Sequence, residues 1–337
     1  MKKILIGAGL ILFGVFIGLG LAEGMVRIFY PHARDYAIPG NLFAIDDDLG
    51  WKLAPSKTAT HRSRYFEARY RTNAQGFRDE ERTAAKASGV YRILLYGDSL
   101  IFGWGLNDEE RLSNIMQSQR SGLEVWNHGI AGWGLDQEIV LYEKEGASLN
   151  ADAAIFFVGA STLSRIRTGF IYSKYKPVFR REPDGRLTRV PVPKLKNEAV
   201  SLLYGMLSPF YLPYFVQTQL ATFNEARNEA GPSLTESRRM VDAFAKDLLR
   251  IAGNTARRRN HHIAIVAANL SRADRSELRS FCNEAGIEYL EIGSEIRAGT
   301  TSDENSNFIF GKYDGHWNAK ANKLIATQLL AQMKYGP

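Results

Sequence analysis

A serine and a histidine far apart in the chain are the side chains whose types could together carry out nucleophilic chemistry. Ser99 follows an apolar run in Gly97-Asp98-Ser99-Leu100, and His316 lies in Asp314-Gly315-His316. A serine hydroxyl is a poor nucleophile unless a general base lies within hydrogen-bond reach. Asp314, two residues before the histidine, could fix the tautomer of the ring. We therefore take Ser99, His316 and Asp314 as the candidate nucleophile, base and orienting group.

The other histidines fit this chemistry less well. His128 adjoins a second glycine-rich turn and is the one serious rival as a base. His32 and His61 precede the main domain, and His261 and His262 start a predicted strand, so surface or packing roles suit these four.

The elements that must position Ser99 are alternating strands and helices from Tyr91 onward, a pattern typical of a parallel sheet covered by helices on both faces. A serine at the carboxyl end of the first strand lies where open α/β sheets bind ligands, beside a helix N-terminus. The predicted strands are Tyr91–Tyr96, Leu123–Trp126, Ala153–Val158, His262–Ala268 and Ile287–Ile292, and the predicted helices are Leu135–Ala147, Ser237–Ala256, Arg272–Glu284 and Ala319–Met333.

The composition is that of a globular protein able to bury a full core. The chain has 337 residues, 45% of them hydrophobic and 23% charged, and a net charge of +7. These values exclude a disordered, collagen-like or coiled-coil protein. The lone cysteine, Cys282, excludes an intramolecular disulfide and a cysteine-based zinc site.

The N-terminal sequence predicts a membrane anchor. Lys2 and Lys3 precede an uncharged run from Ile4 to Ala22, about one bilayer thickness of helix. We favour an uncleaved single anchor over a cleaved signal peptide, whose apolar core is shorter, although Gly20-Leu21-Ala22 resembles a cleavage site. The positive-inside tendency then places the main domain outside the inner membrane.

The chain divides into an anchor or signal segment (1–25), an irregular or β-rich leader that packs on the main domain (26–88), and an α/β domain (89–337) with an insertion at about 165–235. Within the insertion, Arg165 to Lys196 holds ten basic and two acidic residues. This cluster either binds anionic lipid headgroups or an acidic glycan, or is a solvated segment balanced by acidic neighbours. The apolar run Leu202–Phe215 is too short to span a membrane. We expect a helix packed on the core, with a lid or a membrane-surface contact as the alternative.

Three motifs resemble ordered blocks of the GDSL/SGNH hydrolases: Gly97-Asp98-Ser99-Leu100, Asn127-His128-Gly129-Ile130-Ala131-Gly132, and Asp314-Gly315-His316. Gly50-Trp51 and Asn73–Arg78 are similar to the leader of membrane-anchored bacterial members. The resemblance implies a three-layer α/β/α, flavodoxin-like sandwich and the activity of an esterase, lipase, deacetylase or O-acyltransferase.

By the same resemblance, Ser99 is the nucleophile, His316 the general base and acid, and Asp314 the orienting residue. The Ser99 and Gly132 N–H groups are implied as oxyanion donors, with Asp98 and Asn127 in support. A single residue separates Asp314 from His316, as in periplasmic polysaccharide O-acetyltransferases of the superfamily, which favours glycan acylation.

The third block departs from the family. Where members read Gly-x-Asn-Asp, this chain reads Gly159-Ala160-Ser161-Thr162, so the asparagine that completes the oxyanion hole is missing. Losing one such donor typically slows an enzyme roughly 100- to 1000-fold. The hydroxyl of Ser161 or Thr162 is a possible replacement donor.

Two hypotheses follow. The first is a membrane-tethered serine esterase or O-acyltransferase acting through an acyl-enzyme on an acylated glycan or lipid-linked saccharide of the envelope. The second is a non-catalytic scaffold or binding module in envelope polysaccharide assembly. We expect no cofactor, because the first turn lacks a phosphate-binding glycine loop, and no metal, because no paired-histidine spacing occurs beyond His261-His262. We expect no nucleic-acid partner, because the main domain is predicted to lie outside the cytoplasm. The sequence indicates neither the oligomeric state nor the acyl group.

Overall fold

The centre of the fold is a five-stranded parallel sheet. The computed structural model describes residues 2–337 except 36, 147, 173, 217–218, 220–239, 294–295, 297–306, 312–313, 335 and 337. The strands are β5 (Tyr91–Gly97), β6 (Leu123–Gly129), β7 (Ala153–Gly159), β12 (His262–Ala268) and β13 (Glu288–Glu291), in the order β13-β12-β7-β5-β6. Every neighbouring pair is parallel. This is the doubly wound, flavodoxin-like order, so the predicted fold class is confirmed.

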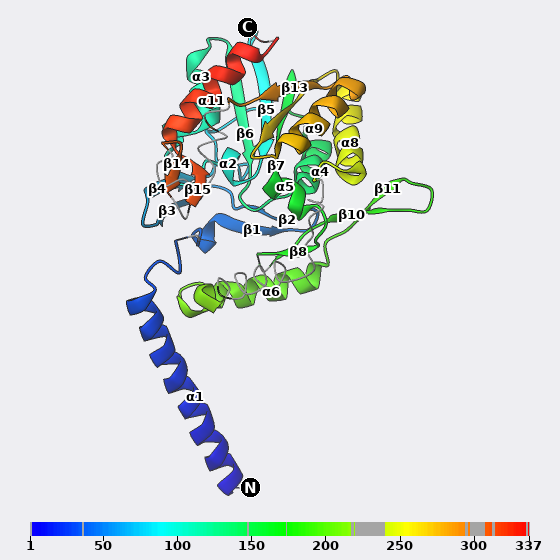
Figure 1. Ribbon diagram of the computed structural model, residues 1–337. Helices are drawn as coiled ribbons and strands as arrows, with labels where there is room; N and C mark the ends of the chain where they lie inside the picture. The colour runs from blue at the N-terminus through cyan, green and yellow to red at the C-terminus, as the bar shows by residue number, and fades with distance from the viewer. Residues whose placement is uncertain are drawn as a thin grey trace.

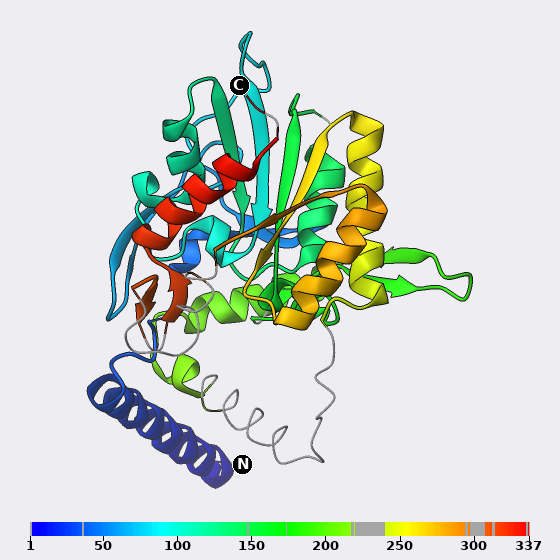
Figure 2. The ribbon, with the colours of Figure 1, turned by 45° about the horizontal axis from the view of Figure 1, so that its top comes forward.

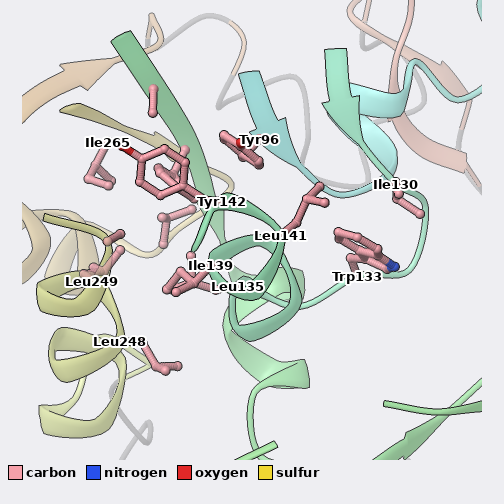
Figure 3. Close-up of a cluster of buried hydrophobic side chains, with 14 of the residues drawn as sticks. Tyr96, Ile130, Trp133, Leu135, Ile139, Leu141, Tyr142, Leu248, Leu249 and Ile265 are labelled. Atoms are coloured by element: carbon pink, nitrogen blue, oxygen red, sulfur yellow. The ribbon is translucent and has the colours of Figure 1, made fainter. Parts of the chain in front are cut away.

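Helices cover both faces of the sheet (Figures 1 and 2). Successive strand residues point to opposite faces, so Ile93 and Leu95 lie in one buried cluster, and Leu94 and Tyr96 lie in the other. The first cluster lies against α3 (Leu112–Gln119) and α11 (Ala319–Gln332). The second, part of which is shown in Figure 3, lies against α4 (Leu135–Glu145), α8 (Ala243–Arg259) and α9 (Arg272–Ala285).

The predicted elements match the observed ones to within a few residues, except at the start of α8. The helix expected from Ser237 begins at Ala243, because the Asp242 side chain accepts hydrogen bonds from the N–H groups of Phe244 and Ala245 and caps the helix there. Residues 237–239, where we expected it to start, lie outside the described residues, as does Ala147 at the expected end of α4.

The leader forms short strands, as predicted. After the 3-10 turn η1 (Gly40–Leu42), β1 (Phe43–Asp46) pairs with β2 (Gly50–Leu53), and β3 (Thr58–Arg62) pairs with β4 (Glu67–Arg71), both antiparallel. Leader side chains, among them Trp51 and Tyr70, are buried in the cluster formed with α4 and α8.

The described part of the insertion forms small hairpins and helical segments, and α5 (Ala160–Arg165) leads into it. Its elements include β8 (Phe170–Ile171), β9 (Lys174–Tyr175), β10 (Val178–Arg181), β11 (Leu187–Val190) and α6 (Lys194–Leu207). Eight of the ten basic side chains from Arg165 to Lys196 form ion pairs, including the fully buried pair of Lys176 with Asp136. The others are Arg165–Asp98, Arg167–Asp242, Arg180–Glu182, Arg181–Asp247, Arg186–Asp184, Arg189–Asp48 and Lys194–Asp47. This geometry favours the balanced segment over a free anion-binding patch.

The apolar run Leu202–Phe215 does not pack on the core, and that prediction is wrong for its helical part. Leu202 and Met206 in α6 are 70% and 66% exposed. The helix instead contacts the body through Asn197, which is buried and bonded to Gly50 and Tyr175.

The N-terminal helix α1 (Lys2–Phe29) extends away from the domain (Figure 1). Its residues Lys3–Phe29 are long and apolar enough to cross a membrane, and none of the apolar window is buried. A signal sequence passes the same test, so anchor and signal remain alternatives on this observation.

Candidate active site

Ser99 is the first residue of the short helix α2 (Ser99–Phe102), directly after β5. The Asp98 side chain accepts a hydrogen bond from the N–H of Leu100 and caps this helix. The strand-to-helix turn therefore places the serine at the carboxyl edge of the sheet, as predicted.

His316 reaches Ser99 from the other end of the chain. It lies in β15 (Asp314–Trp317), which pairs with β14 (Ile309–Gly311) in an irregular hairpin before α11. His316 Nε2 is 2.8 Å from Ser99 Oγ, and His316 Nδ1 is 2.7 Å from Asp314 Oδ1. The three side chains thus form a continuous hydrogen-bonded chain in which Nε2 can accept the serine proton.

Asp314 is held as an anion. It is buried, which by itself would raise the pKa of its carboxyl group. Hydrogen bonds from the His316 ring and backbone, the charge of His316, and a bond from Trp104 outweigh burial and leave the pKa below its ordinary value. An Asp314 that is ionised at neutral pH keeps a proton on Nδ1 of His316 and leaves Nε2 free to act as base.

Trp104 is a part of the site that the sequence reasoning missed. Its Nε1–H donates to Asp314 Oδ2 at 3.1 Å, and its ring stacks on His316 with a centroid separation of 4.6 Å. It follows α2 in Gly103-Trp104-Gly105. A tryptophan between two glycines close behind the serine motif was the only sequence signal for it.

The rival base, His128, is not at the site. Its ring is buried and stacks against Tyr96 and Trp126, and burial lowers its pKa to about 3. A ring that cannot take up a proton near neutral pH is unsuited to general-base catalysis. His61 is also buried, in agreement with its predicted packing role.

Two backbone N–H groups are the candidate oxyanion donors. Within the described part of the chain, neither Ser99 N–H nor Gly132 N–H donates to a protein acceptor. Gly132 has φ +85°, a conformation that glycine adopts without strain. Ile130 N–H donates to Gly97 C=O, which ties the Gly132 turn to the end of β5.

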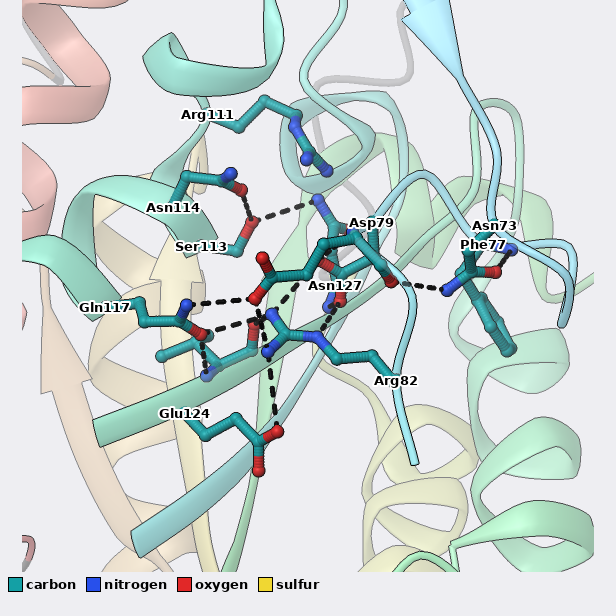
Figure 4. A network of polar contacts seen from close by, with 12 residues as sticks. Asn73, Phe77, Asp79, Arg82, Arg111, Ser113, Asn114, Gln117, Glu124 and Asn127 are labelled. Carbon is teal, nitrogen blue, oxygen red and sulfur yellow. Dashed lines mark hydrogen bonds and ion pairs between the residues drawn. The ribbon is translucent and has the colours of Figure 1, made fainter. Parts of the chain in front are cut away.

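The Asn127 side chain stabilises the turn that leads to Gly132. Its side-chain oxygen accepts from Gly129 N–H, and its amide donates to Ile101 C=O. The Asn127 N–H in turn donates to Asp79 of the leader, whose carboxylate pairs with Arg82 (Figure 4). The predicted supporting role of Asn127 is therefore to fix the loop, through contacts that reach into the leader.

The predicted replacement donors in the third block, the hydroxyls of Ser161 and Thr162, already donate hydrogen bonds to other groups. Ser161 Oγ donates to Asp98 Oδ2 at 2.6 Å, and Thr162 Oγ1 donates to Gly159 C=O. Because a hydroxyl carries one proton, neither group has a proton left for an oxyanion, and this prediction is corrected.

Arg165 is a second residue that the sequence reasoning missed, since it appeared there only as a member of the basic cluster. Its Nη1 donates at 2.9 Å to both Asp98 Oδ2 and Trp133 C=O. Asp98 adjoins Ser99, and Trp133 adjoins Gly132. Arg165 therefore cross-links the two loops that carry the candidate oxyanion N–H groups.

The leader also supports the site from beneath. The buried Arg78 guanidinium donates to the carbonyl groups of Phe102, Gly103 and Leu106, around the loop that bears Trp104. Gly105 N–H donates to Tyr70 Oη, which bonds to His61 Nδ1. Burial lowers the pKa of His61 to about 4, so this ring is neutral at pH 7.

Comparison with known proteins finds similar structures but no similar sequence. No family model and no curated protein matches the chain, but solved structures do. The chain is structurally similar to GDSL lipolytic proteins and esterases. Examples are a G-D-S-L family lipolytic protein from Desulfitobacterium hafniense (11% identity, TM-score 0.39, covering 72% of this chain and 99% of that chain), the esterase EstA from Pseudoalteromonas (14%, 0.38, 72% and 96%) and an acetylxylan esterase from Geobacillus stearothermophilus (10%, 0.40, 75% and 97%). At this level of similarity, the chemistry of the site rests on its own geometry.

The site contains no evident metal cradle. Among the described residues, no group of three or more His, Cys, Asp or Glu side chains is arranged to hold a metal ion.

Proposed function

We propose that this chain is a serine esterase or O-acyltransferase of the SGNH type that acts through an acyl-enzyme at Ser99. The observation that carries the proposal is the 2.8 Å contact between Ser99 Oγ and His316 Nε2, backed by Asp314. An activated serine next to two free backbone N–H groups is the arrangement that acyl transfer needs.

Each step follows from this geometry. Ser99 Oγ bonds to the ester carbonyl carbon as its proton passes to His316 Nε2, and the Ser99 and Gly132 N–H groups bind the resulting oxyanion. The ester C–O bond then breaks, and the leaving alcohol takes the proton from His316. Water or a sugar hydroxyl then bonds to the acyl carbon and gives its proton to His316. The bond between that carbon and Ser99 Oγ breaks, His316 returns the proton to Ser99, and the acid or the acylated sugar leaves.

The proposed setting is the outer face of the bacterial inner membrane, with α1 as a single anchor and the α/β domain in the periplasm. The length and apolarity of α1 and the two lysines before its apolar run support this orientation. An acylated envelope glycan or lipid-linked saccharide is the proposed substrate, supported by the short Asp314–His316 spacing and by this location.

The proposal is tested by treating the full chain in detergent with a fluorophosphonate probe and measuring intact mass. We expect one adduct in the unaltered chain and none in Ser99→Ala or His316→Ala. A folded chain that does not label, or a His316→Ala variant that labels at the original rate, would overturn the proposed mechanism.

The second candidate, a binding module without catalysis, is favoured by one observation. Neither hydroxyl of the third block is available to an oxyanion. It predicts glycan binding that survives Ser99→Ala and weakens when Arg180, Arg181, Arg186 and Arg189 are neutralised together. Unchanged binding by that variant would exclude the basic hairpin as the binding surface.

A further inference from the structure

Helix α6 exposes an apolar stripe that the domain does not cover. Leu195, Leu202 and Met206 are 79%, 70% and 66% exposed. At about 100° of rotation per residue these three positions lie on one side of the helix, opposite the buried Asn197 that bonds to the body. Leu203 and Leu207 extend the stripe on one edge. Such a contiguous apolar surface marks an interaction site.

The segment after α6 is fastened to the end of the apolar helix α1. The backbone N–H groups of Tyr211 and Leu212 donate to the carboxylate of Glu23 at 2.8–3.0 Å. The rings of Tyr30 and Phe215 lie 4.6 Å apart. The attachment is therefore made at the domain end of α1.

Glu23 also marks the depth at which a bilayer would end. The uncharged run of α1 stops at Ala22, and its 19 residues from Ile4 span about 28 Å of helix, close to the hydrocarbon thickness of a bilayer. Groups bonded to Glu23 then lie at the boundary between acyl chains and headgroups.

The surroundings of Glu23 have the composition of that boundary. The guanidinium groups of Arg27 and Arg34 lie over the ring of Tyr211, and Arg34 also lies over Tyr214. Tyrosine side chains are enriched where the apolar core of a membrane meets water, and arginine side chains near the end of a membrane helix can extend their charged groups to that boundary. Lys196 is exposed at one edge of the apolar stripe of α6, where it can reach lipid phosphates, whereas Lys194 is paired with Asp47.

Both ribbon views place α6 on the side of the domain from which α1 extends (Figures 1 and 2). We propose that α6 lies in the membrane interface, with Leu195, Leu202 and Met206 inserted at the boundary of headgroups and acyl chains, as a second attachment to the bilayer. This inference rests on the membrane anchoring by α1 in the proposed function.

A short series of contacts connects α6 to the candidate active site. Asn197 of α6 bonds to Tyr175 in β9, and the β8–β9 turn carries Tyr172. The Tyr172 ring lies 3.0 Å from the place that a side chain on Gly132 would occupy, and Arg165 donates to its hydroxyl. An α6 fixed on the bilayer would thus hold Tyr172 beside the oxyanion turn and present the site to substrates carried on lipid.

The test uses the full chain in nanodiscs of phosphatidylethanolamine and phosphatidylglycerol, with an environment-sensitive maleimide dye on Met206→Cys or Leu195→Cys. The matched control is Arg186→Cys, which lies on the exposed β10–β11 hairpin of the same insertion. Native Cys282 is buried, and burial raises the pKa of its thiol to about 12, so the introduced thiol reacts in its place.

We expect blue-shifted emission at positions 206 and 195, and loss of most of that emission when the nanodisc contains lipids with a nitroxide near the headgroup. The dye at 186 should show neither effect. Emission at 206 that is water-like, or blue-shifted but insensitive to the nitroxide lipid, would overturn the proposal, the latter by showing that protein covers the stripe.

Two readouts separate failure of this inference from failure of the proposed function. Fluorophosphonate labelling of Ser99 in the same nanodiscs reports the catalytic proposal independently of the dye. Intact mass shows whether α1 is still part of the chain. A chain cleaved near Ala22 would lack the anchor, and the membrane contact proposed for α6 would be lost with it. A Leu202→Gln/Met206→Gln variant, altered at exposed positions only, should lower the nitroxide sensitivity of a dye at 195 and leave the fold intact.

Discussion

The proton-transfer side of the site and its oxyanion side are held by different kinds of contact. On the first side, Asp314, His316 and Ser99 are joined by direct hydrogen bonds and Trp104 closes the group. On the second, the expected asparagine is absent, and Arg165 and Ser161 converge on the Asp98 carboxylate instead. The difference teaches that the groups of the proton-transfer side hold one another directly, whereas the loops of the oxyanion side are held by the Arg165–Asp98 ion pair and its neighbours.

The largest expected effect is on the proton-transfer side. Asp314→Asn should lower the kcat for a p-nitrophenyl ester roughly 10⁴-fold, because the amide favours the wrong tautomer of His316. Asp184→Asn, on the exposed hairpin, is the matched control and should leave kcat unchanged. An Asp314→Asn variant within tenfold of the original rate would show that Asp314 does not orient the base.

On the oxyanion side, Arg165→Ala should lower kcat roughly 100-fold, the loss expected when one oxyanion donor is misplaced. It also leaves the Asp98 carboxylate buried without its cation, which should cost about 3 kcal/mol of unfolding free energy. Arg165→Lys, measured well below the melting temperature, should recover part of kcat. A variant that loses stability at unchanged kcat would reduce Arg165 to a purely structural role.

Trp104→Phe tests the contact that closes the first side. It keeps an aromatic ring on His316 but removes the hydrogen bond to Asp314. The loss of about 1 kcal/mol of stabilisation should lower kcat roughly fivefold. Because that bond helps to lower the pKa of Asp314, the variant should have a higher Asp314 pKa. A carboxyl with a lowered pKa stabilises the fold above its unfolded pKa, and that stability is lost as the pH falls through the folded pKa. Urea denaturation at a series of acidic pH values should therefore show a smaller loss of stability in Trp104→Phe, and this loss should be complete at a higher pH than in the unaltered chain.

The smallest effect is expected at Glu138, which is buried in α4 on the oxyanion side. Burial, together with the charges of Asp98 and Asp136, raises the pKa of its carboxyl group well above the ordinary value. The folded chain then holds a proton that the unfolded chain has released, so Glu138 makes the fold less stable as the pH rises above the unfolded pKa. Glu138→Gln should melt higher than the unaltered chain at pH 8 and equally at pH 4. Parallel melting curves at the two pH values would contradict a protonated Glu138.

Much of the fold was predictable because its signals are local. Strands such as His262–Ala268 are short apolar runs between turn residues, and the bounds of β12 matched the prediction. The helix at Arg272 begins after Ser271, whose hydroxyl caps it. The outward stripe of α6 was not predictable, because an apolar helical pattern does not say which surface its face will meet.

By itself, the sequence determined which residues form the hydrogen-bonded chain, since Ser99 must follow a strand and Asp314 lies two residues from His316. Only the tertiary structure decided that Trp104 and Arg165 belong to the site and that the hydroxyls of Ser161 and Thr162 have other partners. The physical reason is that a hydrogen bond is made or lost through differences of a few tenths of an ångström in the distances between atoms of separate loops. Residue types and spacing along the chain do not encode those distances.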